Sequence, residues 1–430
     1  MELINKLQES WKDVKSSFLI YEKGQLTFQD LLDEKPINLS EIENGDVVSF
    51  VGDFNSSTII TLLRLIEKNV ILVPLTEETA NQHKYFYEES FSNVLIKNNV
   101  ITKSKKRKHL LLETLRNKNR PGLILFSTGT TGKPKAILHD FTFFLNRYKT
   151  PRPAYKTLNF LLFDHIGGIN TLFHTLFNVG TIISIKERTV ENVMLTCEKF
   201  NVEVLPTTPT FLRMLLFSKI IPKKFPSSIK IITYGTEMMD QNTLTQLSQT
   251  LPNVDFRQTY GLSEIGIVRA KSKKRDSLYM NIGGEGVETK VINNVLFIKS
   301  KYQMLGYLNS SSPFDNKGWY NTQDLVDQDG DYLKFIGRTN EVINVGGLKF
   351  MATDVEKVAL EYPNIYLAKV ISKKNPITGQ HVEIKVQPNA TSDINKKELS
   401  DFLTKKLPSH MVPRRIVIEN IPIGHRFKKL

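Results

Sequence analysis

The segment from Leu125 to Lys135 concentrates hydroxyl groups, glycines and lysines directly behind an apolar run. Gly129 and Gly132 permit backbone angles that other residues avoid, so main-chain N–H groups can approach an anion. These features predict a phosphate-binding loop that follows a buried strand. A Walker loop is excluded, because Pro134 stands where that pattern requires Ser or Thr. The other candidate phosphate ligands are Ser127, Thr128, Thr130, Thr131, Lys133 and Lys135.

The loop resembles the phosphate loop of the adenylate-forming superfamily, which includes acyl-CoA and aryl-CoA ligases, the adenylation domains of peptide synthetases, and luciferase. The family form is a run of Ser, Thr and Gly followed by Gly-x-Pro-Lys-Gly. Further family motifs occur in the same order, so the resemblance covers nearly the whole chain. The loop at residues 343–347 is most similar to the acyl-CoA and aryl-CoA ligase branch. The further motifs lie at residues 258–264, 304–309, 318–325, 329–347 and 421–430.

The resemblance implies which residues would hold ATP and magnesium. Tyr260 would offer a ring face to the adenine, and the Ser263 hydroxyl would lie near the phosphates. Glu264 would ligate magnesium, for which a carboxylate oxygen is a suitable hard ligand. Asp324 would accept hydrogen bonds from both ribose hydroxyls, and Arg338 would contact the nucleotide. The strand end at Tyr234 and Gly235, together with Gly261, completes the implied ATP-binding set.

The C-terminal motifs imply a mobile domain. Asn340 takes the hinge position, although Asp and Lys are more frequent there in the family. Gly346 and Gly347 would form the loop that accompanies thiol transfer. Lys428, six residues after Pro422, takes the position of the catalytic lysine. A frayed basic tail is the alternative interpretation of these last residues.

Three positions depart from the family pattern. Ala136, Gln323 and Phe427 stand where the family carries glycine. The change at Gln323 leaves the neighbouring carboxylate in place but predicts an altered turn. These departures leave open a degenerate nucleotide-binding module as an alternative to an enzyme.

The segment from Thr157 to Gly168 predicts a strand that ends in Asp164 and His165. In acyl-CoA and aryl-CoA ligases the matching segment lines the carboxylate pocket, which would make His165, Gly167 and Gly168 pocket residues here. Peptide-synthetase domains instead carry a Phe-Asp pair whose aspartate binds the substrate ammonium. An alignment on residues 165–168 moves Asp164 out of that position, and a buried carboxylate would suit an uncharged acyl group poorly. The resemblance therefore favours an acyl or aryl acid without an α-amine.

Composition sets broad limits on the class of protein. With 430 residues, ordinary apolar and charged fractions and one cysteine, the chain predicts a globular protein without a disulfide framework. No apolar run reaches the ~18 residues of a membrane span, so a cytoplasmic protein is expected. The net charge of +14 suggests nucleic-acid binding, but the basic runs at residues 103–108 and 271–275 lack interleaved aromatics. We interpret these runs as solvated loops.

Alternating strands and helices must position these residues. The pattern predicts strands at 47–51, 70–73, 94–96, 122–126, 158–163, 181–185 and 230–234, with an amphipathic helix at 57–67. The fold class is therefore α/β, a large N-terminal domain of parallel or mixed sheets flanked by helices (residues 1–338) with a small mobile α+β domain (residues 339–430). In the small domain, a capping box at Thr353 and Glu356 opens one helix, and Ser392 begins another. Strands are expected near residues 366–372 and 381–386.

The resemblance implies a two-step ligation. A carboxylate attacks the α-phosphate of MgATP, pyrophosphate leaves, and a thiol takes the acyl group from the adenylate. The acid is already ionised at neutral pH, so alignment and charge stabilisation are needed rather than a general base. Lys428, Glu264 and the Thr131 hydroxyl are suited to that task. The acceptor is either CoA or the phosphopantetheine of a carrier protein, and the sequence does not specify the acid or the oligomeric state.

Overall fold

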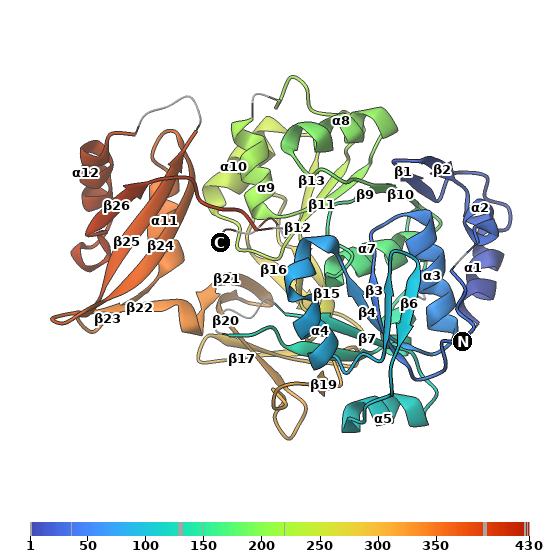
Figure 1. The fold of residues 1–430 in the computed structure, drawn as a ribbon. Helices are drawn as coiled ribbons and strands as arrows, with labels where there is room; N and C mark the ends of the chain where they lie inside the picture. The colour runs from blue at the N-terminus through green and yellow to red at the C-terminus, as the bar shows by residue number, and fades with distance from the viewer. Residues whose placement is uncertain are drawn as a thin grey trace.

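The computed structural model describes residues 2–35, 37–127, 132–148, 150–218, 220–389, 394–424, 427 and 429. Within these residues the chain forms three seven-stranded sheets, a two-stranded sheet and a three-stranded sheet. The seven-stranded sheets precede residue 339, and we call this part the large unit. The residues from 339 onward form the C-terminal unit, which lies to one side of the large unit (Figure 1). The two expected parts are thus present, and the α/β fold class is confirmed.

The sheet that carries the phosphate loop has parallel strands at its centre and antiparallel strands toward its edges. Its central strands are apolar runs that are buried on both faces, as expected for parallel strands covered by helices. The predicted strands at 47–51 and 122–126 are confirmed with the same bounds. In sheet order, the strands are β19 (Gly306–Tyr307), β8 (Ala136–Asp140), β7 (Gly122–Phe126), β4 (Ile71–Leu75), β3 (Val47–Val51), β5 (Val94–Lys97) and β6 (Val100–Lys103).

The second sheet is parallel except at one edge, where β1 pairs with β2 in the antiparallel sense. One of its predicted strands is shorter than expected, because β9 ends at Asn159 and the next residues turn toward α7. In sheet order, the strands are β13 (Asp255–Gln258), β12 (Ile231–Tyr234), β11 (Val204–Thr207), β9 (Lys156–Asn159), β10 (Thr181–Ser184), β1 (Leu19–Tyr21) and β2 (Gly24–Leu26).

The third sheet is antiparallel throughout, so only part of the large unit follows the predicted βαβ pattern. It brings the 258–264 motif and the 318–338 motifs onto one surface. In sheet order, the strands are β14 (Tyr260–Leu262), β15 (Gly266–Ser272), β16 (Met280–Gly283), β21 (Tyr332–Arg338), β20 (Tyr320–Asp329), β18 (Val295–Ser300) and β17 (Val287–Ile292).

Helices cover the sheets and supply most of the remaining apolar surface. One large core joins α1, α3 and α7 to strands of the first two sheets, and a second core packs α8, α9 and α10 against the second sheet. No helix among the described residues is both long and apolar enough to cross a lipid bilayer. The α-helices of the large unit are α1 (Leu3–Trp11), α2 (Phe28–Asp33), α3 (Ser56–Glu67), α4 (His83–Glu89), α5 (Leu110–Asn117), α6 (Phe141–Asn146), α7 (Ile166–Phe177), α8 (Val190–Phe200), α9 (Pro209–Phe217) and α10 (Gln241–Thr250).

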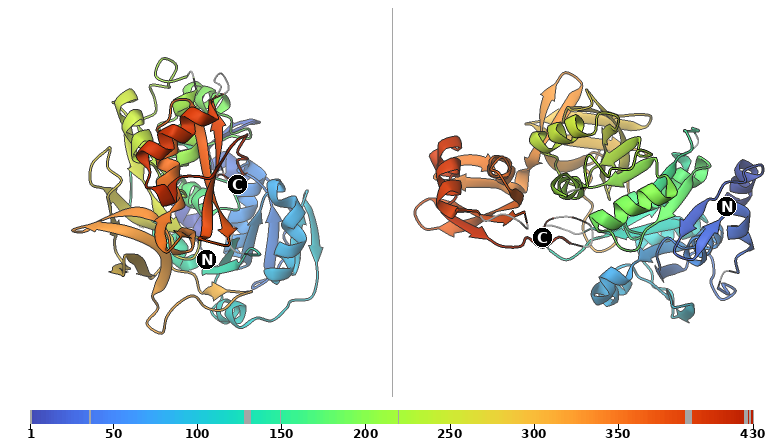
Figure 2. Two further views of the ribbon diagram at one scale, coloured as in Figure 1. Left: turned by 90° about the vertical axis from the view of Figure 1, so that its left-hand side faces the viewer. Right: turned by 90° about the horizontal axis from the view of Figure 1, so that it is seen from above.

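The C-terminal unit has its own apolar core, formed by two helices packed on a three-stranded sheet. The segment after β26 runs back toward the large unit, as Figure 1 and the right-hand view of Figure 2 both show. The elements of this unit are β22 (Val342–Val345), β23 (Leu348–Met351), α11 (Ala352–Leu360), β24 (Ile365–Asn375), β25 (Gly379–Pro388), α12 (Lys396–Lys406) and β26 (Arg415–Ile418).

Both predicted helix starts in the C-terminal unit are wrong. Helix α11 begins at Ala352, and its first turn is closed by Asp354, which accepts a hydrogen bond from the backbone N–H of Met351. Thr353 instead donates its hydroxyl hydrogen to the carbonyl of Ile336. Helix α12 begins at Lys396 with Asn395 as its cap, while Ser392 lies outside the described residues.

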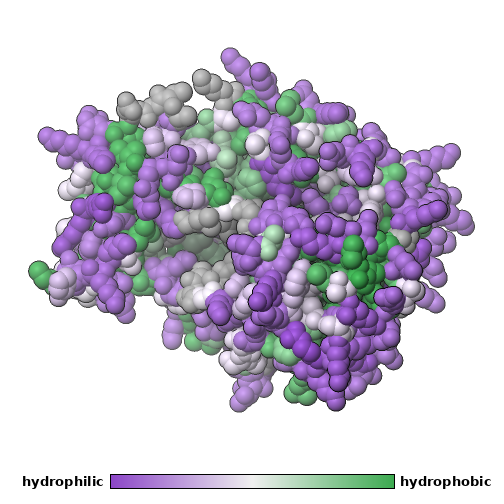
Figure 3. Space-filling model, in the orientation of Figure 1, coloured by the Kyte–Doolittle hydropathy of each residue, from purple (hydrophilic) through white to green (hydrophobic). Residues whose placement is uncertain are grey.

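The surface shown in Figure 3 is mainly hydrophilic, with apolar side chains in separate patches. Part of the positive charge is used within the molecule. Lys103 and Lys106 lie 3.6 and 3.1 Å from carboxylate oxygens of the buried Asp46. Lys273 forms an ion pair with Asp329. These lysines of the basic runs therefore neutralise local carboxylates.

Candidate functional site

The base of the phosphate loop is closed by main-chain and side-chain hydrogen bonds. Ser127, directly after β7, donates its N–H to the carbonyl of Lys135 at 3.1 Å, and its hydroxyl accepts from the N–H of Lys135 at 3.2 Å. Asn309 bonds to both sides of Lys135, because it donates to the carbonyl of Pro134 and accepts from the N–H of Ala136. The predicted ligands Thr128, Gly129, Thr130 and Thr131 lie outside the described residues.

The two lysines of the loop lie against tyrosine rings. The ammonium of Lys133 is 5.8 Å from the ring centre of Tyr85, and that of Lys135 is 4.7 Å from the ring centre of Tyr307. Such contacts attract a cation to the negative face of the ring. The two charges are therefore held close to the closed base of the loop.

Tyr307 links Glu264 to Lys135. Its ring contacts the ammonium of Lys135, and its hydroxyl donates to Oε1 of Glu264 at 2.9 Å. Burial raises the pKa of Tyr307 well above its ordinary value, and the charge of Glu264 raises it further. Tyr307 therefore stays protonated and acts as a donor. The described residues contain no group of three or more His, Cys, Asp or Glu side chains that could hold a metal ion. A magnesium ion at Glu264 would therefore need phosphate oxygens and water as further ligands.

Tyr260, Asp324 and Arg338 come together as the sequence predicts. The buried carboxylate of Asp324 accepts from the Tyr260 hydroxyl at 2.6 Å and from Arg338 Nε at 2.9 Å, each on a different oxygen. Burial raises the pKa of Asp324, and Arg338 opposes this rise. One face of the Tyr260 ring stacks on Phe335, with 4.5 Å between ring centres and planes inclined by 15°. An adenine would have to stack on the opposite face.

His139, on β8 of the first sheet, contacts the turn that carries Ser263 and Glu264. His139 is buried, and its Nε2 lies 2.7 Å from the carbonyl of Ser263. Because a carbonyl can only accept, Nε2 carries the proton in this hydrogen bond. Burial lowers the pKa of His139 to about 4, so the ring is neutral near pH 7. The contact joins β8 to the start of the third sheet and fixes the Glu264 turn relative to the phosphate loop.

Two glycines of the ATP-binding set are needed for close packing. A Cβ atom at Gly235 would lie 2.4 Å from the hydroxyl oxygen of Thr259, and one at Gly261 would lie 2.8 Å from the Cα atom of Ile267. Thr259 also donates its N–H to the carbonyl of Tyr234 at 2.7 Å. These contacts hold the end of β12 against the tyrosine motif.

Two of the three departures from the family pattern occupy left-handed backbone conformations. The φ angles of Gln323 and Phe427 are 60° and 53°, in the region where a side chain is disfavoured and glycine is not. The altered turn expected at Gln323 is therefore not found. The glycine-like conformation is kept with a glutamine in it, so that Asp324 still reaches Tyr260.

The segment at 164–168 begins helix α7 rather than ending a strand. His165 is the N-cap, and its Nδ1 accepts from the N–H of Gly167 at 3.0 Å. A Cβ atom at Gly168 would lie 2.0 Å from the carbonyl oxygen of Leu162, so this glycine allows the first helical turn to pack on the preceding chain. Asp164 and Arg188 are both buried. Burial lowers the pKa of Arg188, and the negative charge of Asp164 is one of those that oppose this change. The pocket role of His165, Gly167 and Gly168 stays a prediction.

The predicted hinge and thiol-transfer residues lie where the C-terminal unit begins. Asn340 is in a short 3₁₀ turn, Thr339–Glu341, between β21 and β22. Gly346 and Gly347 form the two-residue turn of the β22–β23 hairpin, and both have positive φ angles, as such turns require. The N–H of Gly346 donates to the carbonyl of Thr378, within the same unit.

Lys428 lies outside the described residues, but its neighbour Lys429 is described. The Lys429 ammonium donates to Glu356 at 2.7 Å and to the carbonyl of Ala368 at 2.9 Å, both in the C-terminal unit. The Lys429 side chain therefore makes a structural contact within the C-terminal unit. Sequence reasoning assigned no role to Asn309, Tyr307 or His139. The first two stand inside the 304–309 motif, and the third could not be separated from an ordinary core histidine.

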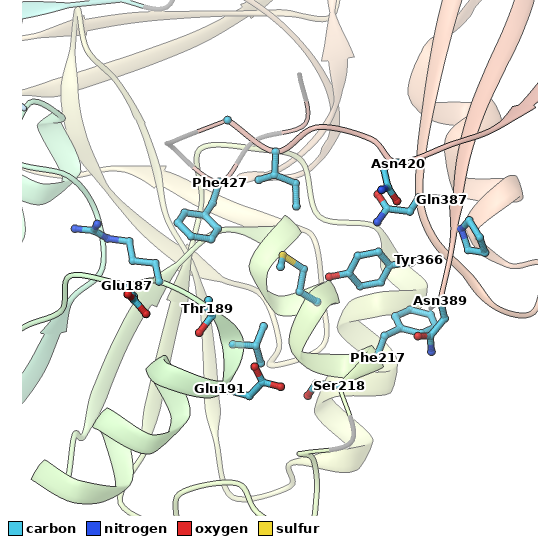
Figure 4. Close-up of a pocket in the computed structure, with 16 residues that line it drawn as sticks. Glu187, Thr189, Glu191, Phe217, Ser218, Tyr366, Gln387, Asn389, Asn420 and Phe427 are labelled. Atoms are coloured by element: carbon cyan, nitrogen blue, oxygen red, sulfur yellow. The ribbon is translucent and has the colours of Figure 1, made fainter. Parts of the chain in front are cut away.

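A cavity of about 820 Å³ lies between the large and C-terminal units. Figure 4 shows Tyr366 from the C-terminal unit on one side of it, Phe217 near α9, and the ring of Phe427 pointing from the C-terminal segment toward the large unit. The acidic side chains of Glu187 and Glu191 line the opposite wall. The cavity makes the contact between the units open to solvent on one side.

The fold and the arrangement of these motifs are those of an adenylate-forming enzyme. The sequence matches the AMP-binding enzyme family over residues 40–307, and the chain belongs to that family. The structure is similar to the crystal structure of an anthranilate CoA ligase in complex with anthranoyl-AMP, with a TM-score of 0.82 and 15% identity over 99% of this chain and 95% of the other.

Curated relatives include ligases with different acceptors. A 4-coumarate–CoA ligase-like protein of Arabidopsis thaliana is 24% identical over 69% of this chain and 58% of its own length. A D-alanine–D-alanyl carrier protein ligase of Lactococcus lactis is also 24% identical, over 72% of this chain and 68% of its own. The chain thus spans somewhat more than half of the plant relative that it matches.

Proposed function

We propose that this protein activates a carboxylic acid with ATP and then transfers the acyl group to the thiol of CoA. The observation that carries the proposal is that two groups of residues lie near each other. In the first group, Tyr260 and Arg338 both bond to Asp324. In the second group, Tyr307 contacts both Glu264 and Lys135. Tyr320 on β20 is close enough to both groups for the charges of Glu264 and Asp324 to raise its pKa, in addition to the larger effect of burial. A nucleotide held by the first group would direct its phosphates toward the second.

The residues fit the proposed nucleotide. Each oxygen of Asp324 accepts one hydrogen bond within the protein, and a carboxylate has about four acceptor sites, so two ribose hydroxyls can still be accommodated. Lys133 and Lys135 supply positive charge near the phosphates. Magnesium, when bound by Glu264, would neutralise charge on the phosphate oxygens. We retain the boundary after residue 338, the hinge at Asn340 and the catalytic role of Lys428 as parts of this proposal.

In the first step, a carboxylate oxygen of the acid forms a bond to the α-phosphorus, the bond to the bridging oxygen breaks, and pyrophosphate leaves. In the second step, the thiol sulfur attacks the acyl carbon, AMP leaves, and the thiol proton passes to solvent. The protein contributes alignment and charge stabilisation to both steps. In the first step this is sufficient because the acid is already ionised near pH 7, whereas in the second step the thiol must also lose its proton.

We infer that the acid lacks an α-amine. Asp164 is the residue that could bind an ammonium group, but its negative charge already interacts with the buried Arg188. It also directly precedes His165, the N-cap of α7. Two of the names support an acid without an α-amine, since 4-coumarate and anthranilate are aromatic acids of that kind, whereas the D-alanine–D-alanyl carrier protein ligase is named for an amino acid. CoA is the proposed acceptor, because residues 343–347 resemble the CoA-ligase form of that loop.

The test is acid-dependent exchange of labelled pyrophosphate into ATP, run with amino acids and with their deaminated analogues. We expect exchange with the deaminated acids, AMP rather than ADP as the product, and thioester formation when CoA is added. Stoichiometric ADP would contradict adenylation. Exchange with amino acids alone, abolished by Asp164→Ala, would contradict the proposed acid class, and transfer only to a carrier protein would contradict CoA.

A further inference from the structure

The C-terminal segment contacts the large unit through Phe427, a residue that stands where the family carries glycine. The ring centre of Phe427 lies 4.8 Å from that of Phe160 and 6.1 Å from that of Phe211. Its carbonyl accepts from the Thr208 hydroxyl at 3.1 Å. The ring therefore joins the apolar core of the second sheet, although the residue belongs to the segment after β26.

These contacts lie at the edge of the sheet where the nucleotide motifs begin. Phe160 directly follows β9, and Thr208 directly follows β11. Thr207, the last residue of β11, pairs with Tyr234 at the end of β12, next to Gly235 of the ATP-binding set. In parallel sheets, ligands bind outside these carboxyl ends. Phe427 thus places the chain end one strand away from the proposed nucleotide site.

The C-terminal segment after β26 contacts both the large unit and the C-terminal unit. Phe427 is bound to the large unit, whereas Lys429 is bound to Glu356 and Ala368 of the C-terminal unit. The N–H of Phe427 also donates to the carbonyl of Gly424 at 2.8 Å, on the side of Phe427 away from Lys429 in the sequence. Position 428 stands in sequence between one contact on each unit.

Helix α9 provides a second attachment for the C-terminal unit. Arg213, buried on α9, donates to the carbonyls of Leu360, Ile365 and Tyr366 at 3.2, 3.0 and 2.8 Å. The ring of Phe217, at the end of the same helix, packs edge to face with that of Tyr366, at 5.9 Å between centres. Phe211 and the helix cap Thr208 hold Phe427, so α9 contacts both the body and the end of the C-terminal unit.

We propose that Phe427 is a positioning residue, which docks the C-terminal segment on α9 and β9 in the arrangement that forms the adenylate. The left-handed backbone at this position supports the proposal. A phenylalanine is disfavoured at a φ of 53°, so its ring contacts offset a strain that glycine would avoid. The inference rests on the proposed function, because it assigns this arrangement to the first of the two steps.

The docking is tested by a distance measurement that needs no substrate. Spin labels at Leu195→Cys on α8 and Ile377→Cys between β24 and β25 would occupy exposed side chains, and the native Cys197 is buried. The parent should give one narrow distance distribution. Phe427→Gly should add a second, separate population, while Phe427→Tyr should keep the parent distribution. Phe143→Ala, which removes a half-exposed ring from α6, is the matched control and should change nothing.

The positioning role is tested by separating the two half-reactions with the acid that the exchange screen identifies. Phe427→Gly should lower pyrophosphate exchange by about tenfold or more, as expected for removing a largely buried aromatic contact, yet leave CoA transfer from a supplied acyl adenylate within about twofold. Phe427→Tyr should restore exchange. Unchanged distances and exchange in Phe427→Gly would overturn the inference, as would equal losses in both half-reactions. A chain without exchange activity but with the distance change would overturn only the proposed function.

Discussion

His139 should make the free energy of unfolding of the large unit fall as the pH decreases below about 6.5. The ring is 2% exposed, and its Nε2 donates to the carbonyl of Ser263. Burial lowers its pKa to about 4, the hydrogen bond opposes this change, and the charge of Arg147 adds to it. In the unfolded chain the ordinary value of 6.5 applies.

The sign follows from which state binds the proton first. Between about pH 6.5 and 4 the unfolded chain is protonated at His139 and the native protein is not, so protons favour unfolding. The stabilising effect is complete above about pH 6.5 and is lost as the pH falls to about 4. The two pKa values differ by about 2.5, and one pKa unit is worth about 1.4 kcal/mol, so the full loss is about 3 kcal/mol. About 2 kcal/mol of this is already lost at about pH 5.

The matched variant is His139→Gln, whose amide can donate the same hydrogen bond but does not titrate. Unfolding by urea would be followed through the fluorescence of Trp11, which is buried in the same large core as the β7 residues Leu123 and Leu125, in a Trp319→Phe background. The difference in unfolding free energy between the His and Gln proteins should shift by about 2 kcal/mol in favour of Gln between about pH 7.5 and pH 5. A difference that is constant over this range would refute the reasoning.

Four further substitutions test the site. Gln323→Gly should raise the free energy of unfolding by about 1 kcal/mol, because it relieves a left-handed conformation, and urea unfolding that shows a loss would contradict this. Glu264→Gln should raise the Mg²⁺ concentration needed for half-maximal pyrophosphate exchange by about tenfold, since a neutral amide binds the ion less well, and an unchanged Mg²⁺ dependence would remove Glu264 from the metal site. Lys428→Ala should abolish exchange whereas Lys429→Ala, which breaks the pair with Glu356, should retain most of it; the reverse result would transfer the catalytic role to Lys429.

The sequence predicted the parts of the site that depend on residue type within short motifs. Tyr260, Asp324 and Arg338 were expected to act on one nucleotide, and the structure brings them into direct contact. The roles of Tyr307 and Asn309 could not be predicted, because they depend on β19 lying beside β8, which no local pattern records. The motifs therefore predicted which of these residues would lie together but not the neighbouring contacts that orient them.

The errors in the C-terminal unit have a local cause. A Thr-x-x-Glu pattern is typical of a helix start, but here Thr353 bonds to Ile336 and Glu356 bonds to the backbone of Val370 and to Lys429. Tertiary partners have replaced the local capping bonds. His165 shows the opposite case, because its side chain makes a local capping bond at the start of α7 where the pattern predicted the end of a strand.

The three hydrogen bonds from Arg213 to carbonyls of the C-terminal unit have a consequence for how that unit would move. The guanidinium of Arg213 is buried in this arrangement and donates to three carbonyls, and burial lowers the pKa of the arginine against the opposing charge of Asp240. Any rotation of the unit must hydrate all of these groups, so it is a reaction that takes up water. Its equilibrium should therefore respond to osmotic pressure: sucrose and other excluded solutes should hold the unit in place, and the step that requires rotation should slow as water activity falls.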